Sequence, residues 1–234
     1  MFGVRIFKIL MLKIIFVVSS AHVFGQDFDG VSWERDRSNT PRQDKDGSGR
    51  TPSTRGATDN QGLFTFEITT NRGGTQRQEF QFERRSGYHR FRGEFRISSV
   101  RPDFDRVSVA QTHDDQTGSA GVFSIYQVRR SGGEYVFGVQ GDTTEASNGY
   151  STFSTVAIRL DRWYRLETRT LSSTRDGSFE VAELYDGSRR IWSETILGGG
   201  ENEQYKKVGA YRLTNGSGRV VVDWRDMRFY TGDN

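Results

Sequence analysis

The chain has 234 residues, no cysteine, and 33 basic against 30 acidic side chains. The absence of cysteine excludes disulfides, thiol nucleophiles and cysteine-ligated zinc. Three of the basic residues and none of the acids lie in the first 25 positions, so the remainder is formally neutral and does not indicate a nucleic-acid partner.

The first 25 residues have the pattern of a secretory signal sequence. Arg5, Lys8 and Lys13 accompany two apolar runs, 9–12 and 14–18, and residues 23–25 offer a cleavage site. The apolar stretch is too short and too interrupted for a membrane span, and no later stretch approaches one. We therefore expect a secreted protein, extracellular or periplasmic, that begins near Gln26, has no membrane span and is a monomer.

Residues 26–60 are polar, and only Phe28, Val31 and Trp33 among them could pack against a core. This composition predicts a flexible N-terminal tail. Asp44, Asp46 and Gly47 resemble part of a calcium loop, but the glutamate that should close the loop is missing, so we expect no metal site.

Residues 61–234 predict a single all-β domain. Alternating runs are separated by Gly, Asn, Asp and Ser clusters roughly every 8–12 residues, and no amphipathic helix is evident. The pattern predicts a two-sheet antiparallel jelly-roll sandwich of concanavalin-like form, with the site in a concave groove. The expected strands are 63–69, 77–84, 89–98, 106–113, 122–129, 134–140, 154–158, 163–170, 179–185, 190–195, 207–213 and 220–230.

Two of these segments carry a polar face. In residues 76–85, Phe80 can enter the core while Arg77 and Glu79 share the opposite face, because alternate side chains of a strand point to opposite sides. In residues 205–211, Tyr205, Lys207, Gly209 and Tyr211 fall on one face of the predicted strand. Gly209 has no side chain there, so a ligand could approach the backbone. Solvated faces and an ordinary edge strand are the alternative interpretations.

The third segment contains the polar pair Gln111 and His113. These residues lie two apart on one strand and therefore project to the same face. After the signal sequence, the chain has only His89 and His113, so acid–base chemistry by a histidine falls to one of them. The alternative is a histidine that is merely hydrogen-bonded.

The three segments together resemble, in chain order, the blocks of polysaccharide lyase family 7, the alginate lyases. That family has Arg-x-Glu-Leu, Gln-(Ile/Val)-His and Tyr-Phe-Lys-x-Gly-x-Tyr blocks. This chain has Arg77-Gln78-Glu79-Phe80, Gln111-Thr112-His113 and Tyr205-Lys206-Lys207-Val208-Gly209-Ala210-Tyr211. The resemblance extends from about residue 63 to residue 230.

The chain departs from the family pattern at Phe80, Thr112, Lys206 and Leu213. Lys206 stands where the family has Phe, and Leu213 stands where it has a sugar-contacting Gln. The resemblance makes alginate the first expected substrate, and the departure at Leu213 leaves glucuronan and ulvan open.

The resemblance implies β-elimination at a uronic acid without a metal or other cofactor. Arg77, Gln111 and His113 would neutralise the C6 carboxylate, in the manner of an oxyanion hole. Tyr211 would protonate the leaving oxygen, and either Tyr211 or His113 would remove the C5 proton, depending on the stereochemistry at C5. Lys207 and Tyr205 would bind the anionic polysaccharide, and Glu79 would orient Arg77.

Two other functions fit an all-β secreted chain. A jelly-roll glycoside hydrolase needs two facing carboxylates, and Glu180 and Glu183 are predicted to lie on opposite faces of their strand. A non-catalytic lectin-like module would use aromatic platforms, for which Tyr126, Trp163, Tyr164 and Trp224 are the candidates.

Overall fold

The structure is a computed structural model that describes residues 28–39, 42–44, 53–55, 62–70, 77–100, 106–114, 122–141, 151–173, 178–197, 203–212 and 218–233. The expected signal sequence, the calcium-like Asp46 and Gly47, and Leu213 lie outside these residues. Trp33–Gly232 form one compact unit, which contains the strands discussed below except for the first residue of β1, Ser32, and the last residue of β15, Asp233. Within the described residues, no helix could cross a membrane.

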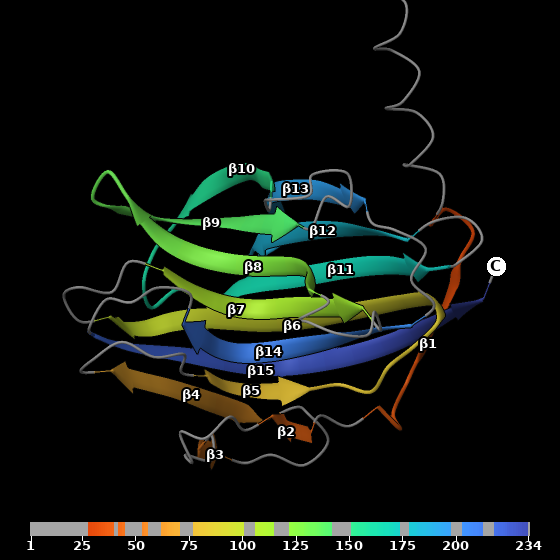
Figure 1. The fold of residues 1–234 in the computed structure, drawn as a ribbon, viewed down its shortest axis with the longest axis horizontal. Helices are drawn as coiled ribbons and strands as arrows, with labels where there is room; N and C mark the ends of the chain where they lie inside the picture. Colours follow the sequence, from red (N-terminus) through yellow and green to blue (C-terminus); the bar gives the residue numbers. More distant parts are fainter. Residues whose placement is uncertain are drawn as a thin grey trace, which may run out of the picture. The chain divides into compact units, whose positions relative to one another are not determined.

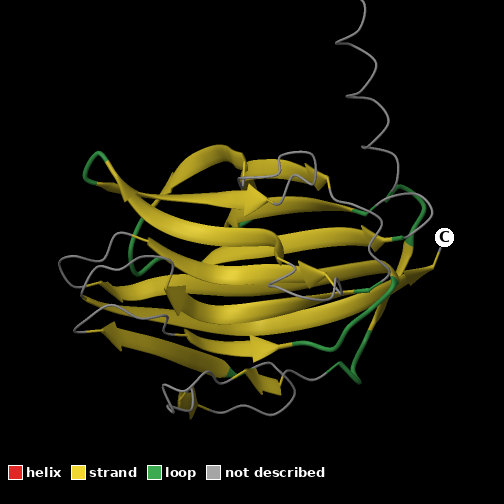
Figure 2. Cartoon of the chain, viewed as in Figure 1, coloured by secondary structure: helices red, strands yellow, loops and turns green. Residues whose placement is uncertain are grey.

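Two antiparallel sheets make up the fold (Figures 1 and 2). The seven-stranded sheet has the order β10 (Ser151–Ile158), β9 (Glu134–Gly141), β8 (Val122–Ser131), β7 (Arg106–Asp114), β14 (Gln204–Arg212), β5 (Arg77–Gln81) and β2 (Arg42–Asp44). The eight-stranded sheet has the order β13 (Arg189–Leu197), β12 (Phe179–Asp186), β11 (Tyr164–Ser172), β6 (Gly87–Val100), β15 (Gly218–Asp233), β4 (Leu63–Thr70) and β3 (Ser53–Arg55), with β1 (Ser32–Arg35) beside β15.

Aromatic side chains from both sheets fill the core. Phe95 contacts Trp224 with ring centroids 5.3 Å apart, and Phe137 meets Trp192 edge-on at 5.2 Å. Tyr126 is fully buried among them. This packing explains why a chain rich in aromatics and poor in leucine forms a sandwich, since flat rings fill the space between two pleated surfaces.

The predicted fold class and all twelve expected strands are confirmed. The observed strands mostly extend one to three residues beyond the expected ends. The strand expected for 77–84 ends at Gln81, although the Phe82 N–H still donates to the Lys206 carbonyl at 2.9 Å. The alternation of apolar and polar residues was sufficient to predict these strands, because one face of each strand is buried.

The segment 26–60 differs from the flexible tail that its composition predicted. It contains β1, β2 and β3, which add to β15, β5 and β4 respectively. Asn39 is buried, and its Oδ1 accepts a hydrogen bond from the Glu83 N–H at 2.7 Å. Asp36 forms an ion pair with Arg85 at 2.6 Å. In the described parts of the segment, buried Phe28 and Val31 occur together with polar contacts and backbone pairing, which the composition of the segment does not reveal.

A buried polar cluster joins the two sheets behind β7 and β14. Its centre is Glu180 on β12, whose carboxylate accepts hydrogen bonds from Thr170 on β11 at 2.8 Å and from Lys206 on β14 at 2.9 Å. The remaining donors to this carboxylate come from the opposite sheet and are Thr112, Ser124 and Tyr126. Burial opposes ionisation of Glu180, but Lys206 and these hydrogen bonds hold its pKa at about 2.

Candidate active site

The residues predicted for a site lie on three adjacent strands of the seven-stranded sheet. They are Arg77 and Glu79 on β5, Gln111 and His113 on β7, and Tyr205, Lys207 and Tyr211 on β14, which runs between the other two strands.

Cross-strand register places these side chains on one face of the sheet, which we call the site face. Lys207 lies directly opposite Gln111 on β7 and opposite Gln81 on β5, and Tyr205 lies opposite His113. Directly opposed residues of paired strands project to the same side. The site face is therefore the side away from the core, which takes the alternate residues of the same strands.

A chain of hydrogen bonds runs along the site face from Glu79 to His113. Gln111 Nε2 donates to Glu79 Oε1 at 2.6 Å, and Gln111 Oε1 lies 3.2 Å from His113 Nε2. A carboxylate can only accept, so the amide nitrogen must face Glu79 and the amide oxygen must face the imidazole. That oxygen in turn requires a proton on His113 Nε2, which leaves Nδ1 as the basic nitrogen of the neutral ring.

This hydrogen bond gives Glu79 a partner that the sequence did not suggest. The resemblance assigned Glu79 to orient Arg77, which stays a prediction, and the structure shows that its carboxylate holds the Gln111 amide. Glu79 is 1% exposed and Gln111 is 3% exposed, so both groups are fixed in a dry environment. This arrangement matters for the chemistry of His113, because the fixed amide of Gln111 determines which ring nitrogen of His113 carries the proton.

Tyr205 forms a platform beside His113. The two rings are stacked with centroids 5.0 Å apart and an interplanar angle of 14°. The guanidinium of Arg84 lies 5.4 Å from the Tyr205 ring centroid, and the Lys207 ammonium lies 5.7 Å from it. Two cations and an imidazole therefore gather around one phenol ring.

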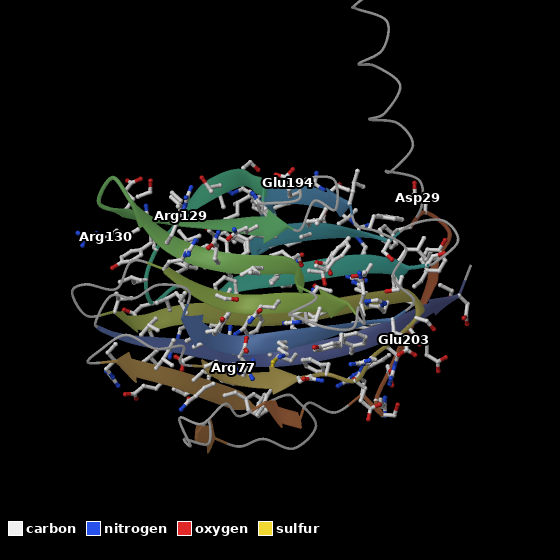
Figure 3. The ribbon with its side chains drawn as sticks, in the orientation of Figure 1. Asp29, Arg77, Arg129, Arg130, Glu194 and Glu203 are labelled. Carbon is white, nitrogen blue, oxygen red and sulfur yellow. The ribbon has the colours of Figure 1, made fainter. Side chains whose placement is uncertain are left out.

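Tyr211 occupies the other end of the site on β14. It lies opposite Arg77 on β5 and opposite Ser108 on β7, so Gln111 separates it from His113 along the sheet. Figure 3 labels Arg77 on β5. The side chain of Tyr211 is half-buried. A sugar ring lying over Gln111 would have a phenol on one side and an imidazole on the other.

Gly209 has a different role from the one predicted. The sequence suggested that it opens the site face to a ligand. In the structure its φ is +148°, and an added Cβ would lie 2.2 Å from the Gln78 carbonyl oxygen and 3.0 Å from Phe66. A register shift between β14 and β7 falls at this position. Glycine is therefore required by the bulge and by close packing of the strands.

His89, the other histidine considered for acid–base work, is not part of the site. It lies on β6 of the eight-stranded sheet, is 2% exposed and stacks on Phe229 at 5.7 Å. Burial lowers the pKa of its imidazole to about 4. A neutral ring in the core is a packing element.

The sequence missed Gln81, which follows Arg77 and Glu79 at the same spacing on β5. It lies opposite Lys207 and lines a hollow of about 290 Å³ together with residues 82–84. Its position two residues after Glu79 on the same strand was the feature of the sequence that could have identified it. A larger hollow of about 900 Å³ lies at β9, β10 and β13 and contains none of the predicted site residues.

The lectin-like alternative loses three of its four aromatic platforms, because Tyr126, Tyr164 and Trp224 are buried in the core. Trp163 is half-buried and is covered by the guanidinium groups of Arg96 and Arg225, 4.8 and 4.1 Å from its ring. Glu180 and Glu183 lie on opposite faces of β12 as predicted, Glu180 in the core and Glu183 paired with Arg190.

Neither a protein-family model nor a curated protein sequence matches the chain. Solved structures do match it. The alginate lyase of Klebsiella pneumoniae superimposes with a TM-score of 0.57 at 11% identity, over 73% of this chain and 82% of that one. A family 7 alginate lyase in complex with product gives 0.55 at 15% identity, over 77% and 83%. The endo-β-1,4-glucuronan lyase of Trichoderma reesei gives 0.52 at 12% identity, over 87% and 92%.

The chain has the fold of the family 7 alginate lyases. The glucuronan lyase shares that fold, and both likenesses cover most of each chain. At identities of 11–15% the likeness concerns the fold, so the argument for chemistry depends on the side chains of the site face.

Proposed function

We propose that this protein is a secreted polysaccharide lyase that cleaves a uronic-acid polysaccharide by β-elimination. The observation that carries the proposal is the Glu79–Gln111–His113 chain on the same face as Arg77, Lys207 and Tyr211. Those groups supply an oriented base, cations for a carboxylate and a phenol.

The first requirement of β-elimination is to stabilise the sugar carboxylate as the C5–H bond breaks. The developing enolate places a second negative charge on that group, so preorganised donors lower the barrier. Arg77 can bind a carboxylate with two parallel N–H bonds, and Lys207 adds a point charge. The second N–H of the Gln111 amide can also reach the substrate, since Glu79 accepts only one of them.

The second requirement is a base and an acid. His113 Nδ1 accepts the C5 proton, the C4–O bond breaks as the C4=C5 double bond forms, and Tyr211 donates its phenolic proton to the leaving oxygen. Gln111 holds the imidazole in the tautomer that this role needs. For a substrate of opposite configuration at C5, Tyr211 performs both transfers and His113 supports the carboxylate.

Alginate is the first substrate we propose, and glucuronan is the second. The solved structures that share the fold include alginate lyases and a glucuronan lyase. Arg77, Lys207 and Tyr205 follow one another along the site face, and they offer an anionic sugar no group that distinguishes one uronate from another.

The test is to incubate the protein with polymannuronate, polyguluronate and polyglucuronate and to follow the ultraviolet absorbance of the unsaturated product. Tyr211→Phe is expected to lower turnover by about 10²–10⁴-fold, because it removes only the titrating group. The matched control is Tyr230→Phe on β15 of the other sheet, which should retain full activity. His113→Ala should abolish activity where His113 is the base and weaken it where Tyr211 performs both transfers. Parent-level activity of Tyr211→Phe, or no cleavage of any polymer by the parent, would overturn the proposal.

A further inference from the structure

Arg129 on β8 lies on the site face beyond the predicted residues. Ile125 lies opposite Gln111, and Arg129 is four residues further along β8, on the same side of the strand. Its side chain is half-buried, and its Nε atom is buried without a hydrogen-bond partner. Figure 3 labels Arg129 on the same sheet as Arg77.

The residue directly opposite Arg129 on β7 is another arginine, Arg106, and its opposite neighbour on β9 is Val136. Like charges at directly opposed positions destabilise a sheet. Arg129 forms no ion pair with another described residue. The positive charge at this position is therefore not offset by an acid of the described chain.

The eight-stranded sheet shows how the same fold treats an opposed arginine pair elsewhere. Arg90 and Arg169 face each other across β6 and β11. Arg90 pairs with Glu167 at 2.6 Å, and Arg169 pairs with Glu183 at 3.2 Å. Each cation of that pair has its own carboxylate, whereas Arg129 has none.

A row of polar groups connects Arg129 to the candidate active site. Two residues before it on β8, Gln127 is 3% exposed, and its Oε1 atom has no hydrogen-bond partner. Gln127 lies opposite Ser108, which in turn lies opposite Tyr211. Standard strand spacings place the Cα atoms of Arg106 and Arg129 roughly 8 and 12 Å from that of Tyr211. These separations match a sugar unit next to the one being cleaved.

We infer that Arg129 forms a second carboxylate-binding subsite, which takes the uronate adjacent to the scissile unit as the counter-charge that Arg129 lacks among the described residues. The inference rests on the proposed function. A polyuronate carries one carboxylate per sugar, so the missing counter-charge arrives with the substrate. Gln127 can accept a hydroxyl of the same sugar through its unpartnered oxygen.

The experiment compares Arg129→Ala with Arg130→Ala, its exposed neighbour on β8, each in the Tyr211→Phe background so that binding is measured without cleavage. Calorimetric affinity for polymannuronate, polyguluronate and polyglucuronate should fall about ten- to a hundredfold for Arg129→Ala and change little for Arg130→Ala. Without ligand, Arg129→Ala should melt at about the same temperature as the parent, because Arg129 forms no ion pair with another described residue.

The outcomes separate the subsite from the proposed function. If the parent cleaves a polyuronate and the two arginine variants bind alike, the subsite is overturned while the lyase stands. If the parent binds without cleaving and Arg129→Ala alone loses affinity, the subsite stands on a binding protein and the lyase is overturned. A lower melting temperature with unchanged affinity assigns Arg129 to the fold and overturns the subsite, and absence of binding by the parent overturns both.

Discussion

Gln111 links catalytic geometry to the fold through the two ends of one amide. Its nitrogen is fixed by Glu79 at 2.6 Å, and its oxygen therefore faces His113 at 3.2 Å. Because a neutral amide holds the imidazole without adding charge, the ring can be both oriented and unprotonated. A carboxylate in the same place could not donate to Glu79, and it would stabilise the protonated form of the ring.

Gln111→Glu is accordingly expected to shift the acidic limb of the pH–rate profile to higher pH by about one unit or more, because the added carboxylate raises the pKa of a neighbouring imidazole. The measurement is kcat/KM on the preferred polymer from pH 4 to 9. Gln111→Leu serves as the control, since it removes the acceptor without adding charge and should lower turnover with no alkaline shift. An acidic limb in the same place for both variants would show that His113 is not the base.

Among the elements, β14 serves the site and the core at once. Tyr205, Lys207 and Tyr211 face the site, while Lys206 and Val208 face the interior. Alternation along the sequence was enough to sort these residues between faces, and it also placed the polar faces of β5 and β7. It could not explain why a lysine is buried at position 206, because the acid that pairs with Lys206 comes from the other sheet.

Glu180 is that partner, and the pair predicts a non-additive pattern of stability. Lys206→Met leaves a buried carboxylate without its counter-charge and should cost about 3–5 kcal/mol. Lys206→Met with Glu180→Gln removes both charges and should recover most of that loss. Denaturant unfolding of the parent, both single variants and the double variant measures the coupling, and strictly additive losses would contradict a charge pair.

The same pair predicts how stability changes in acid. The pKa of Glu180 is about 2 in the fold against an ordinary value of 4.5, so the unfolded chain takes up this proton first as pH falls. The stabilisation by Glu180 is therefore complete above about pH 4.5 and is lost progressively toward pH 2. The double variant lacks this titration and should show a shallower loss of unfolding free energy over that interval than the parent.

The N-terminal segment predicts another effect at the level of elements. Asn39 bonds both backbone groups of Glu83, through its Oδ1 at 2.7 Å and its Nδ2 at 3.4 Å, next to Arg84 at the Tyr205 ring. Asn39→Ala leaves buried backbone groups unpaired and should cost about 1–3 kcal/mol in unfolding free energy. Arg37→Ala, at an exposed position of the same segment, should cost little. Equal stability of the two variants would restore the sequence-based view of a dispensable tail.

Across the whole molecule, the two sheets distribute charge differently. The outer face of the eight-stranded sheet joins its arginines to acids, as in Arg96–Asp223 at 2.8 Å and Arg225–Glu94 at 2.7 Å. On the site face, Arg129 forms no ion pair with any described residue. A chain that is nearly neutral can therefore keep a guanidinium on this face whose charge no described acid offsets. Composition could not reveal this, since it depends on which strands become neighbours.

A guanidinium that binds substrate without a described acid beside it predicts that salt weakens catalysis on a polyanion much more than it weakens the fold. Raising NaCl from 0.05 to 0.5 M shortens the screening length to a few Å and should lower kcat/KM by about tenfold, mainly through KM. The melting temperature of the free protein should change little, because exposed ion pairs contribute about 0–1 kcal/mol each. Arg129→Ala should show a shallower dependence of log kcat/KM on log salt than Arg130→Ala, since one carboxylate contact is already missing. If kcat/KM does not change with salt while cleavage continues, the substrate is not held through its carboxylates, and the site face binds a neutral stretch of the glycan instead.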